Sequence, residues 1–133
     1  MPMNLRIVCP DSCAFDGTVA FVTVPTTDGE MGIAPLHASE ISTIGPGYVR
    51  VCDERMGQVD HTLAVSGGYV EIAGDKIIVL ANRARDLATV DREEVQAQIQ
   101  GFEDQLSVLS ENDAHRAYLY NEIAWCKLLL AAK

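Results

Sequence analysis

The pattern of hydrophobic and polar residues changes once along this chain, near residue 86. Before that point, short runs rich in β-branched residues alternate with Gly, Pro and Asp, a pattern typical of β-strands joined by turns. The predicted strands cover residues 5–8, 18–24, 48–52, 59–65, 69–72 and 77–81. Because they follow one another closely, without a helix long enough for a parallel crossover, they favour an antiparallel β-sandwich or barrel. Gly67 and Gly68 are predicted to form a tight turn between two of these strands.

Beyond residue 86, proline is absent and apolar residues recur at helical spacing. Asp91, with Glu94 three residues later, predicts a capping box at the start of a first helix. The apolar seam of this helix comprises Val95, Ile99, Phe102, Leu106 and Leu109. A second helix is predicted over about residues 113–132, with an apolar stripe formed by Leu119, Ile123, Cys126 and Leu130. The sequence therefore predicts an N-terminal antiparallel β-sandwich, residues 1–86, followed by a C-terminal antiparallel two-helix hairpin, residues 87–133.

The chain is acidic: its 133 residues include ten Lys or Arg and nineteen Asp or Glu, a formal net charge of −9. Such a surface repels phosphate backbones and anionic headgroups, so nucleic acid and anionic lipid are disfavoured as partners. No apolar run approaches the ~20 residues that span a bilayer, and no signal peptide is visible, so we expect a cytosolic chain. The four cysteines lack the spacing of a metal knuckle and are expected to be reduced.

The residue types that carry most enzyme chemistry form no recognisable site in this sequence. His37, His61 and His115 lack a second metal ligand at helical or hairpin spacing. Ser66 is not part of a Gly-x-Ser-x-Gly sequence, and there is no Gly-x-x-x-x-Gly-Lys-Ser/Thr phosphate loop. An enzyme would need a polar cleft with converging acid and base groups, of which the sequence gives no sign. We therefore expect no catalytic residue, no metal and no cofactor, and interpret the chain as a binding or structural module.

The segment from Asp28 to Ala38 combines turn-forming residues with several apolar ones. One interpretation is a corner of the sandwich whose apolar side chains point inward, with Glu30 and His37 merely exposed. The other interpretation is a fixed rim that contacts a partner. Turn chemistry alone does not decide between the two.

Four segments carry a resemblance to a known family. The first contains Gly29, Glu30, Gly32, Ile33, Pro35, His37 and Ala38, and the others are Gly45-Pro46-Gly47-Tyr48-Val49-Arg50-Val51, Val65-Ser66-Gly67-Gly68-Tyr69-Val70-Glu71-Ile72, and Ile77 to Ala84. In kind, order and spacing they resemble the epsilon subunit of the bacterial F-type, proton-translocating ATP synthase, over about residues 3–130. One position departs from that family, which usually has glycine where this chain has Leu36. The alternative, a free-standing β-sandwich adaptor, would share the composition without needing the loop.

The resemblance implies a non-catalytic subunit of the central stalk of a rotary ATP synthase. Such a subunit would bind the gamma subunit and the ring of c subunits, and would couple rotation of that ring to ATP synthesis in the catalytic head. It would lie at the cytoplasmic face of the cell membrane, peripherally, with membrane association only through the complex. The resemblance also implies that Glu30, Met31, Gly32 and His37 contact the c ring.

In the same family, the helical hairpin can lie folded on the sandwich or extend into the head, where it regulates ATP hydrolysis. The resemblance implies that Tyr118, Trp125, Leu128 and Leu129 contact the beta and alpha subunits in the extended state. Some bacterial relatives bind ATP at the start of the first helix through a motif with arginine where this chain has Glu94. Because a carboxylate there would repel phosphate, no ATP binding is expected.

Overall fold

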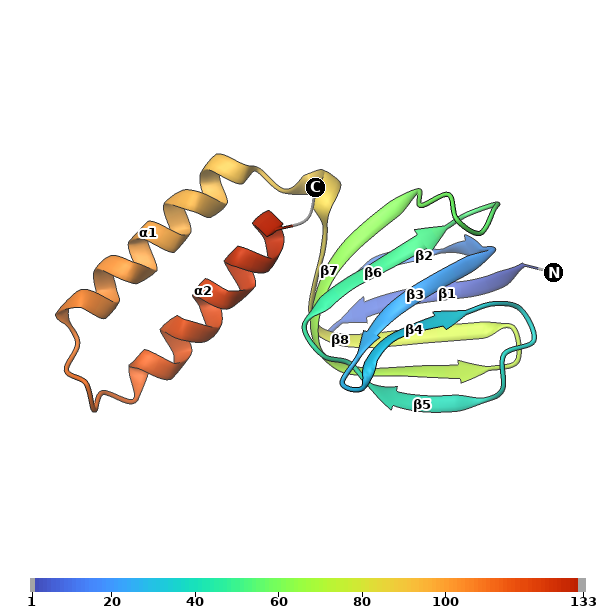
Figure 1. The fold of residues 1–133 in the computed structure, drawn as a ribbon, viewed down its shortest axis with the longest axis horizontal. Coiled ribbons are helices and arrows are strands. Elements are labelled where there is room, and N and C mark those ends of the chain that lie inside the picture. Colours follow the sequence, from blue (N-terminus) through green and yellow to red (C-terminus); the bar gives the residue numbers. More distant parts are fainter. Residues whose placement is uncertain (1, 132–133) are drawn as a thin grey trace. The chain divides into compact units, whose positions relative to one another are not determined.

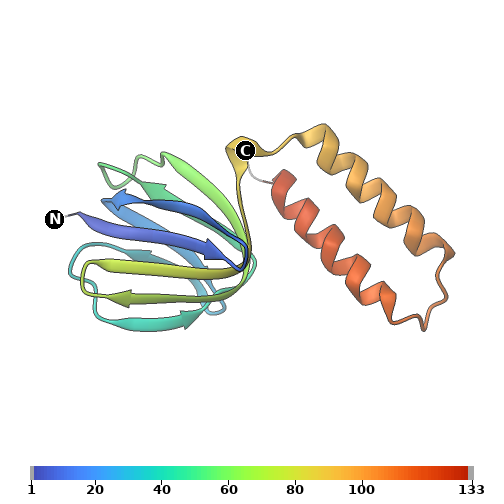
Figure 2. The ribbon, with the colours of Figure 1, turned by 180° about the vertical axis from the view of Figure 1, so that it is seen from behind.

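The computed structural model describes residues 2–131, which form two compact units, the first ending at Ala88 and the second beginning at Thr89. The strands described are β1 (Met3–Cys9), β2 (Ser12–Val19), β3 (Phe21–Thr26), β4 (Gly29–Ile33), β5 (Glu40–Thr43), β6 (Gly47–Cys52), β7 (His61–Ala73) and β8 (Lys76–Asp86). A short 3-10 helix, η1 (Leu87–Thr89), precedes α1 (Arg92–Val108) and α2 (His115–Ala131). Figures 1 and 2 show the strands packed as a sandwich and the two helices antiparallel. The predicted β-sandwich followed by two helices is confirmed.

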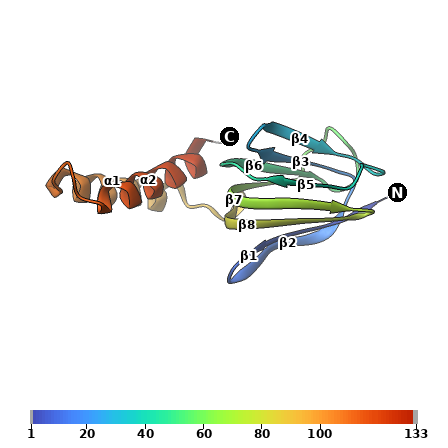
Figure 3. The same cartoon turned by 90° about the horizontal axis from the view of Figure 1, so that it is seen from below.

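The strands form one continuous sheet that folds over to make both layers of the sandwich. Its order is β2-β1-β8-β7-β6-β3-β4, and β5 also pairs with β7. Figure 3 shows β3, β4 and β6 on one side and β1 and β2 on the other, with β7 and β8 between them. Among the described strands, β1 and β8 form the one parallel pair, which differs from the predicted antiparallel sheet. This pair needs no helical crossover, because the intervening strands of the sheet connect β1 to β8.

β7 and β8 run through both layers, and the paired glycines lie where β7 passes from one layer to the other. Residues 61–65 of β7 pair with β6, whereas residues 69–72 pair with β5. Between them, Gly67 and Gly68 have φ values of 72° and 102°, which glycine adopts at little cost. The prediction of a turn at these glycines is therefore wrong. They lie within one continuous strand, where the positive φ values serve a bend rather than a chain reversal.

The bend reverses which face of β7 faces the core. Leu63 and Val65 belong to the core before it, and Val70 and Ile72 belong to the core after it, whereas Ala64 is buried outside this core cluster. Since alternate residues of a strand point to opposite faces, this change from odd to even positions means that the strand has turned over. Both halves of β7 thereby contribute apolar side chains to the same core.

A second reversal divides the strand predicted over residues 18–24. The structure breaks this run at Ala20, whose N–H donates to the carbonyl of Cys52 at 2.8 Å. Val19 ends β2, which pairs with β1, whereas Phe21 begins β3, which pairs with β6. The β-branched residues continue through the crossing, so the local pattern does not reveal it. β4 and β5 are absent from the predicted strands, because turn-forming residues dominate the segment around them.

Both helices begin at capping aspartates in the predicted segments. The Asp91 carboxylate accepts hydrogen bonds from the N–H groups of Glu93 (3.1 Å) and Glu94 (3.3 Å). The Asp113 carboxylate accepts one from the N–H of His115 at 2.9 Å. Each cap satisfies backbone donors that have no partner inside the helix.

The apolar stripe of α2 is confirmed except at its end. Leu119, Ile123 and Cys126 are buried as predicted. At the next turn Leu129 is buried and Leu130 is half-buried, the reverse of the predicted order. At about 100° per residue, both positions lie within about 60° of the direction of Cys126, so helical spacing alone does not decide between them.

Arg116 of α2 links the two helices at the loop end of the hairpin. Its guanidinium donates to the carbonyl of Leu106, in the last turn of α1, at 3.2 Å. It also donates to the hydroxyl of Tyr120 at 2.9 Å and lies 5.6 Å from the centre of that ring. Because the last carbonyls of a helix lack intrahelical partners and carry partial negative charge, a cation there is favourable.

We expect Gly68→Ala to prevent or severely weaken folding of the sandwich. The added methyl group would collide with the carbonyl of Leu80, and alanine would have to adopt a φ near 102°. The free energy of unfolding should fall by more than about 3 kcal/mol, because overpacking adds to backbone strain. Gly74→Ala is the matched control, since its φ is 64° but no atom lies within 4 Å of the added Cβ. It should cost only about 1 kcal/mol, and similar small losses for both in urea unfolding would contradict the prediction.

Candidate functional site

The residues predicted at a partner interface lie on β4 and on the loop that follows it, residues 34–39. β4 is an edge strand that pairs with β3 on one side. Glu30 and Gly32 are exposed, whereas Met31 is half-buried and packs against the core. The segment is therefore a corner of the sandwich with an apolar inner side, and its outer side carries the candidate polar residue.

The Glu30 carboxylate is held by Arg50 of β6. The guanidinium donates to Oε1 of Glu30 at 3.1 Å and lies 5.5 Å from the centre of the Tyr48 ring. The side chains of Glu30 and Arg50 are 61% and 38% exposed, so their ion pair contributes about 0–1 kcal/mol to stability. Its main effect is to orient the carboxylate. Sequence reasoning missed Arg50 and Tyr48, because only the pairing of β3 with both β4 and β6 brings them near Glu30.

An aromatic side chain lies over Gly32. A Cβ at this position would come within 2.8 Å of Cζ of Phe21, on the neighbouring strand β3. Placing an aromatic ring over a glycine covers the exposed backbone of an edge strand. The glycine thus keeps this part of the β4 edge smooth and free of a side chain of its own.

His37 closes a tight turn at the start of the loop. Its N–H donates to the carbonyl of Ala34 at 3.2 Å, and its Nδ1 lies 2.7 Å from the carbonyl oxygen of Ala38. Leu36, the third residue of the turn, has a φ of 71° and is 91% exposed. A turn with Pro35 in second place and a positive φ in third place has the form of a type II turn, which favours glycine in third place.

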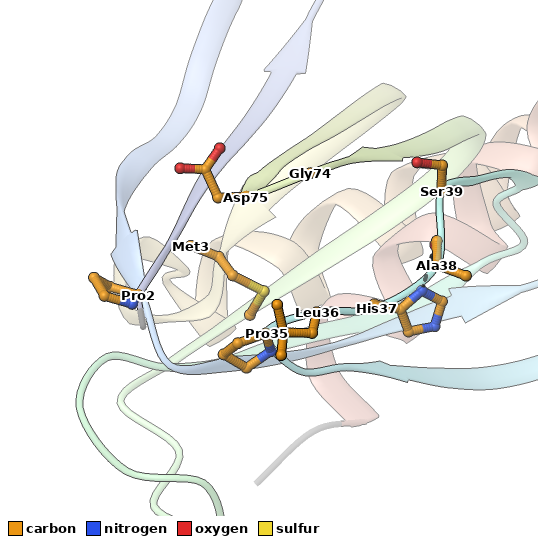
Figure 4. A pocket seen from close by; sticks show the side chains of 9 residues that line it. All are labelled: Pro2, Met3, Pro35, Leu36, His37, Ala38, Ser39, Gly74 and Asp75. Carbon is orange, nitrogen blue, oxygen red and sulfur yellow. Dashed lines mark hydrogen bonds between the residues drawn. The ribbon is translucent and has the colours of Figure 1, made fainter.

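An open pocket of about 540 Å³ lies beside this turn (Figure 4). Three segments line it: the start of β1, the 34–39 loop and the turn between β7 and β8. Figure 4 shows the side chain of Met3 extending toward Pro35 and Leu36. Asp75 and His37 also line it, and Figure 4 shows the Asp75 carboxylate turned outward from Pro35 and Leu36 and the His37 ring beside Ala38.

Glu30 and His37 lie near opposite ends of β4 rather than side by side. Glu30 is close to the turn between β3 and β4, where the N–H of Thr27 donates to the carbonyl of Thr43 at 3.1 Å. His37 follows Ile33, the other end of the strand. A strand rises about 3.3 Å per residue, so Glu30 and Ile33 are separated by roughly 10 Å. A partner that contacts both Glu30 and His37 must therefore extend along most of the β4 edge.

Sequence reasoning also missed an apolar patch on the outer face of the sheet, formed by Val8, Ile41, Tyr69 and Leu80. Leu80 pairs with both Val8 and Tyr69, which places these residues in one row across β1, β8 and β7. Ile41 and Tyr69 are 68% and 40% exposed, and a pocket of about 460 Å³ lies beside the row. The signal was present in β8, whose apolar run over residues 77–81 lacks the alternation of a strand with one solvated face.

The hairpin residues predicted to contact the head differ in exposure. Tyr118 is 52% exposed and stacks on His115, with ring centres 5.1 Å apart. Trp125 and Leu128 are half-buried, and Leu129 is only 4% exposed. The structure therefore does not place all of them on one accessible surface.

The electrostatics give no sign of an activated nucleophile at Cys9. Burial raises the pKa of the Cys9 thiol above its ordinary value, which keeps it protonated at neutral pH. Within residues 2–131, no three His, Cys, Asp or Glu side chains gather as metal ligands would. No helix in this part of the chain is long and apolar enough to cross a membrane.

Comparison with known proteins relates these features to a family. Residues 2–86 match the model of the β-sandwich domain of the ATP synthase delta/epsilon chain. The ATP synthase epsilon chain of Rhodospirillum rubrum is 35% identical over 130 residues, which are 98% of this chain and 95% of that protein. This chain belongs to the ATP synthase epsilon-chain family. A second member, from Desulforamulus reducens, is 39% identical over 115 residues, 86% of this chain and 85% of that one.

Two solved structures share the fold of this epsilon-family chain. One is a chain of the Euglena gracilis mitochondrial ATP synthase (OSCP, F1 and c-ring), with a TM-score of 0.76 at 21% identity, covering 98% of this chain and 80% of the matched chain. The other is from the Tetrahymena thermophila mitochondrial ATP synthase (central stalk and c-ring), with a TM-score of 0.58 at 17% identity and coverages of 98% and 96%. At these identities the likeness establishes the fold. The predicted family, the ATP synthase epsilon subunit, is confirmed by the bacterial relatives.

We expect the Glu30–Arg50 pair to orient the rim of this epsilon-family chain without stabilising it much. A double-mutant cycle of Glu30→Gln and Arg50→Gln, followed by urea unfolding, should give a coupling free energy of about 0.2–1 kcal/mol. Arg50→Gln alone should cost more than Glu30→Gln alone, because it also removes the contact with Tyr48. A coupling above about 2 kcal/mol would mean that the pair is structural and would contradict this prediction.

Proposed function

We propose that this chain is a non-catalytic subunit of the central stalk of the ATP synthase, where it couples rotation of the c ring to ATP synthesis in the catalytic head. The observation that carries the proposal is the match to bacterial epsilon chains over 98% of the chain, which includes both units. In this role the chain lies peripherally at the cytoplasmic face of the membrane and is held there by its partners. It supplies interfaces, and the chemistry of ATP belongs to other subunits.

The sandwich has the mechanical properties that such a role requires. Within residues 2–131, seventeen buried side chains from both layers form one core, and β7 and β8 belong to both layers. Protein cores are close-packed, so one layer cannot slide on the other without opening voids. A rigid body of this kind transmits force between partners without absorbing it in internal motion.

The sandwich has two exposed surfaces, and we assign a different partner to each. We assign the β4 edge, with Glu30, Met31, Gly32 and His37, to the c ring. Glu30 offers an oriented carboxylate there, while Met31 supports the edge from the core side. We assign the outer-face patch, with Tyr69 and Leu80 at its centre, to the gamma subunit, because contiguous exposed apolar surface marks protein interfaces.

The hairpin is the regulatory part of the proposal. In the extended state Tyr118, Trp125, Leu128 and Leu129 would contact the beta and alpha subunits. Tyr118 is accessible in the present state, whereas Leu129 would have to be uncovered. Residues 87–133 carry four basic and eight acidic residues, a net charge of −4, so long-range attraction to any acidic surface of the head would be weak. Apolar packing is therefore the expected basis of any inhibition.

The coupling role predicts the effect of changing the β4 edge. Glu30→Lys combined with His37→Ala should lower the number of protons pumped per ATP hydrolysed in membranes that contain the assembled complex. The sandwich should stay folded, because both side chains are largely outside the core. Proton pumping and ATP hydrolysis are measured together on the same membranes.

A matched control for this variant lies on the hairpin. Glu103→Lys makes the same charge reversal on an exposed residue of the other unit and should leave the ratio unchanged. An unchanged ratio in the β4-edge variant, with the subunit present in the complex, would argue against the assignment of these residues to a coupling contact.

The charge of the hairpin predicts weak and salt-resistant inhibition. Deleting residues 88–133 should raise ATP hydrolysis by the complex only modestly, by about twofold or less. Added salt should leave any inhibition by the full-length chain largely intact, because exposed ion pairs are screened but apolar contacts are not. Many-fold activation on deletion, reproduced in the full-length complex by raising salt, would show instead that ion pairs hold the block.

A further inference from the structure

Leu36 occupies a backbone position that its own turn favours for glycine. The turn is closed by the hydrogen bond from His37 N–H to the Ala34 carbonyl, and Leu36 has a φ of 71°. A side chain in this left-handed region is unfavourable, because its Cβ approaches the following carbonyl oxygen. Non-glycine residues in such conformations cluster at functional sites, where the strain serves a purpose.

The leucine side chain gains no burial within the chain that would offset this strain. It is 91% exposed, the highest value among the exposed large hydrophobic residues of the described part. Ile33, three residues earlier, is by contrast fully buried. Glycine would relieve the backbone, and a polar residue would suit the solvent. A contact outside the chain explains leucine here.

We propose that Leu36 is an apolar anchor for a protein partner. Its side chain enters a recess on a loop of that partner. An apolar side chain of the same loop, next to a Lys or Arg, enters the pocket beside Leu36. We assign this loop to the c ring, so the inference rests on the proposed function.

The lining of the pocket indicates this partner chemistry. Pro2 and Pro35 expose apolar surface to it, and Asp75 lies at its edge with its carboxylate turned outward from Pro35 and Leu36 (Figure 4), whereas no described residue of the lining is Lys or Arg. An apolar pocket with a carboxylate at its margin matches an apolar side chain flanked by a cation. The net charge of −9 also favours approach by a basic surface. The same charge repels anionic lipid, which argues against a membrane as the occupant.

The test compares Leu36→Gly, Leu36→Asn and Leu36→Met in the full-length chain. One measurement is the melting temperature of each variant. The other is the affinity of a complex of the alpha, beta and gamma subunits, reconstituted with each variant, for c rings in phosphatidylcholine nanodiscs. The complex reconstituted without this chain gives the baseline contributed by gamma itself. Binding of each variant to the alpha, beta and gamma complex is measured separately.

Stability and affinity should change in opposite directions. Leu36→Gly should raise the melting temperature by about 3 °C, because the backbone strain is relieved. It should lower affinity for the c ring about tenfold, the effect of removing one leucine side chain from an interface. Leu36→Asn tolerates the left-handed conformation and should lose affinity to the same extent. Leu36→Met keeps an apolar side chain and should retain affinity within about threefold.

Val108→Thr is the matched control, because it removes an apolar side chain that is 81% exposed on the other unit. It should change neither quantity. Equal affinities of Leu36→Gly and the unchanged chain would overturn the anchor while leaving the c-ring assignment in place. Failure of the unchanged chain to raise affinity above the baseline would overturn the proposed function instead. A loss confined to the alpha, beta and gamma complex, or Leu36-dependent binding to empty nanodiscs, would overturn the anchor by assigning Leu36 to gamma or to lipid.

Discussion

A single sheet can enclose a core only if some of its strands belong to both layers, and in this chain that condition depends on Gly67 and Gly68. Their positive φ values turn β7 over between Val65 and Val70, so that both halves of the strand face inward. The same bend lets β7 pair with β6 before the glycines and with β5 after them. The close approach of Gly68 to the β8 backbone leaves no space for a side chain. The positions of β4 and of the 34–39 loop depend on this crossing. The first half of β7 pairs with β6, and β6, β3 and β4 follow one another in that layer.

Much of this architecture is encoded locally and could be predicted from the sequence. The change of periodicity near residue 86, the aspartate caps and most of the α2 stripe are properties of neighbouring residues. The layer crossings at Ala20 and at the glycine pair were not predictable in the same way. A β-branched run looks the same whether it stays in one layer or passes to another, and a glycine pair is equally compatible with a turn and with a bend.

The candidate site shows the same division between local and long-range information. The loop from Gly29 to Ala38 stood out because it combines turn formers with apolar residues. The partner of Glu30, Arg50, could not be found this way, since the contact exists only through the shared neighbour β3. The separation of Glu30 from His37 along β4 was equally hidden, because proximity in sequence says nothing about which end of a strand a residue occupies. A motif of ten residues can therefore divide between two ends of one edge.

The bond between Arg116 and the end of α1 has a consequence for how the hairpin can move. One guanidinium joins α2 to the last turn of α1, while the side chain also stacks on Tyr120 of its own helix. Separation of the helices at the loop end must break this bond. At the opposite end it must instead expose Val95 of α1 and Leu129 of α2, which are buried. The two ends of the hairpin are therefore held by different means, a charged hydrogen bond at the loop and apolar packing at the base.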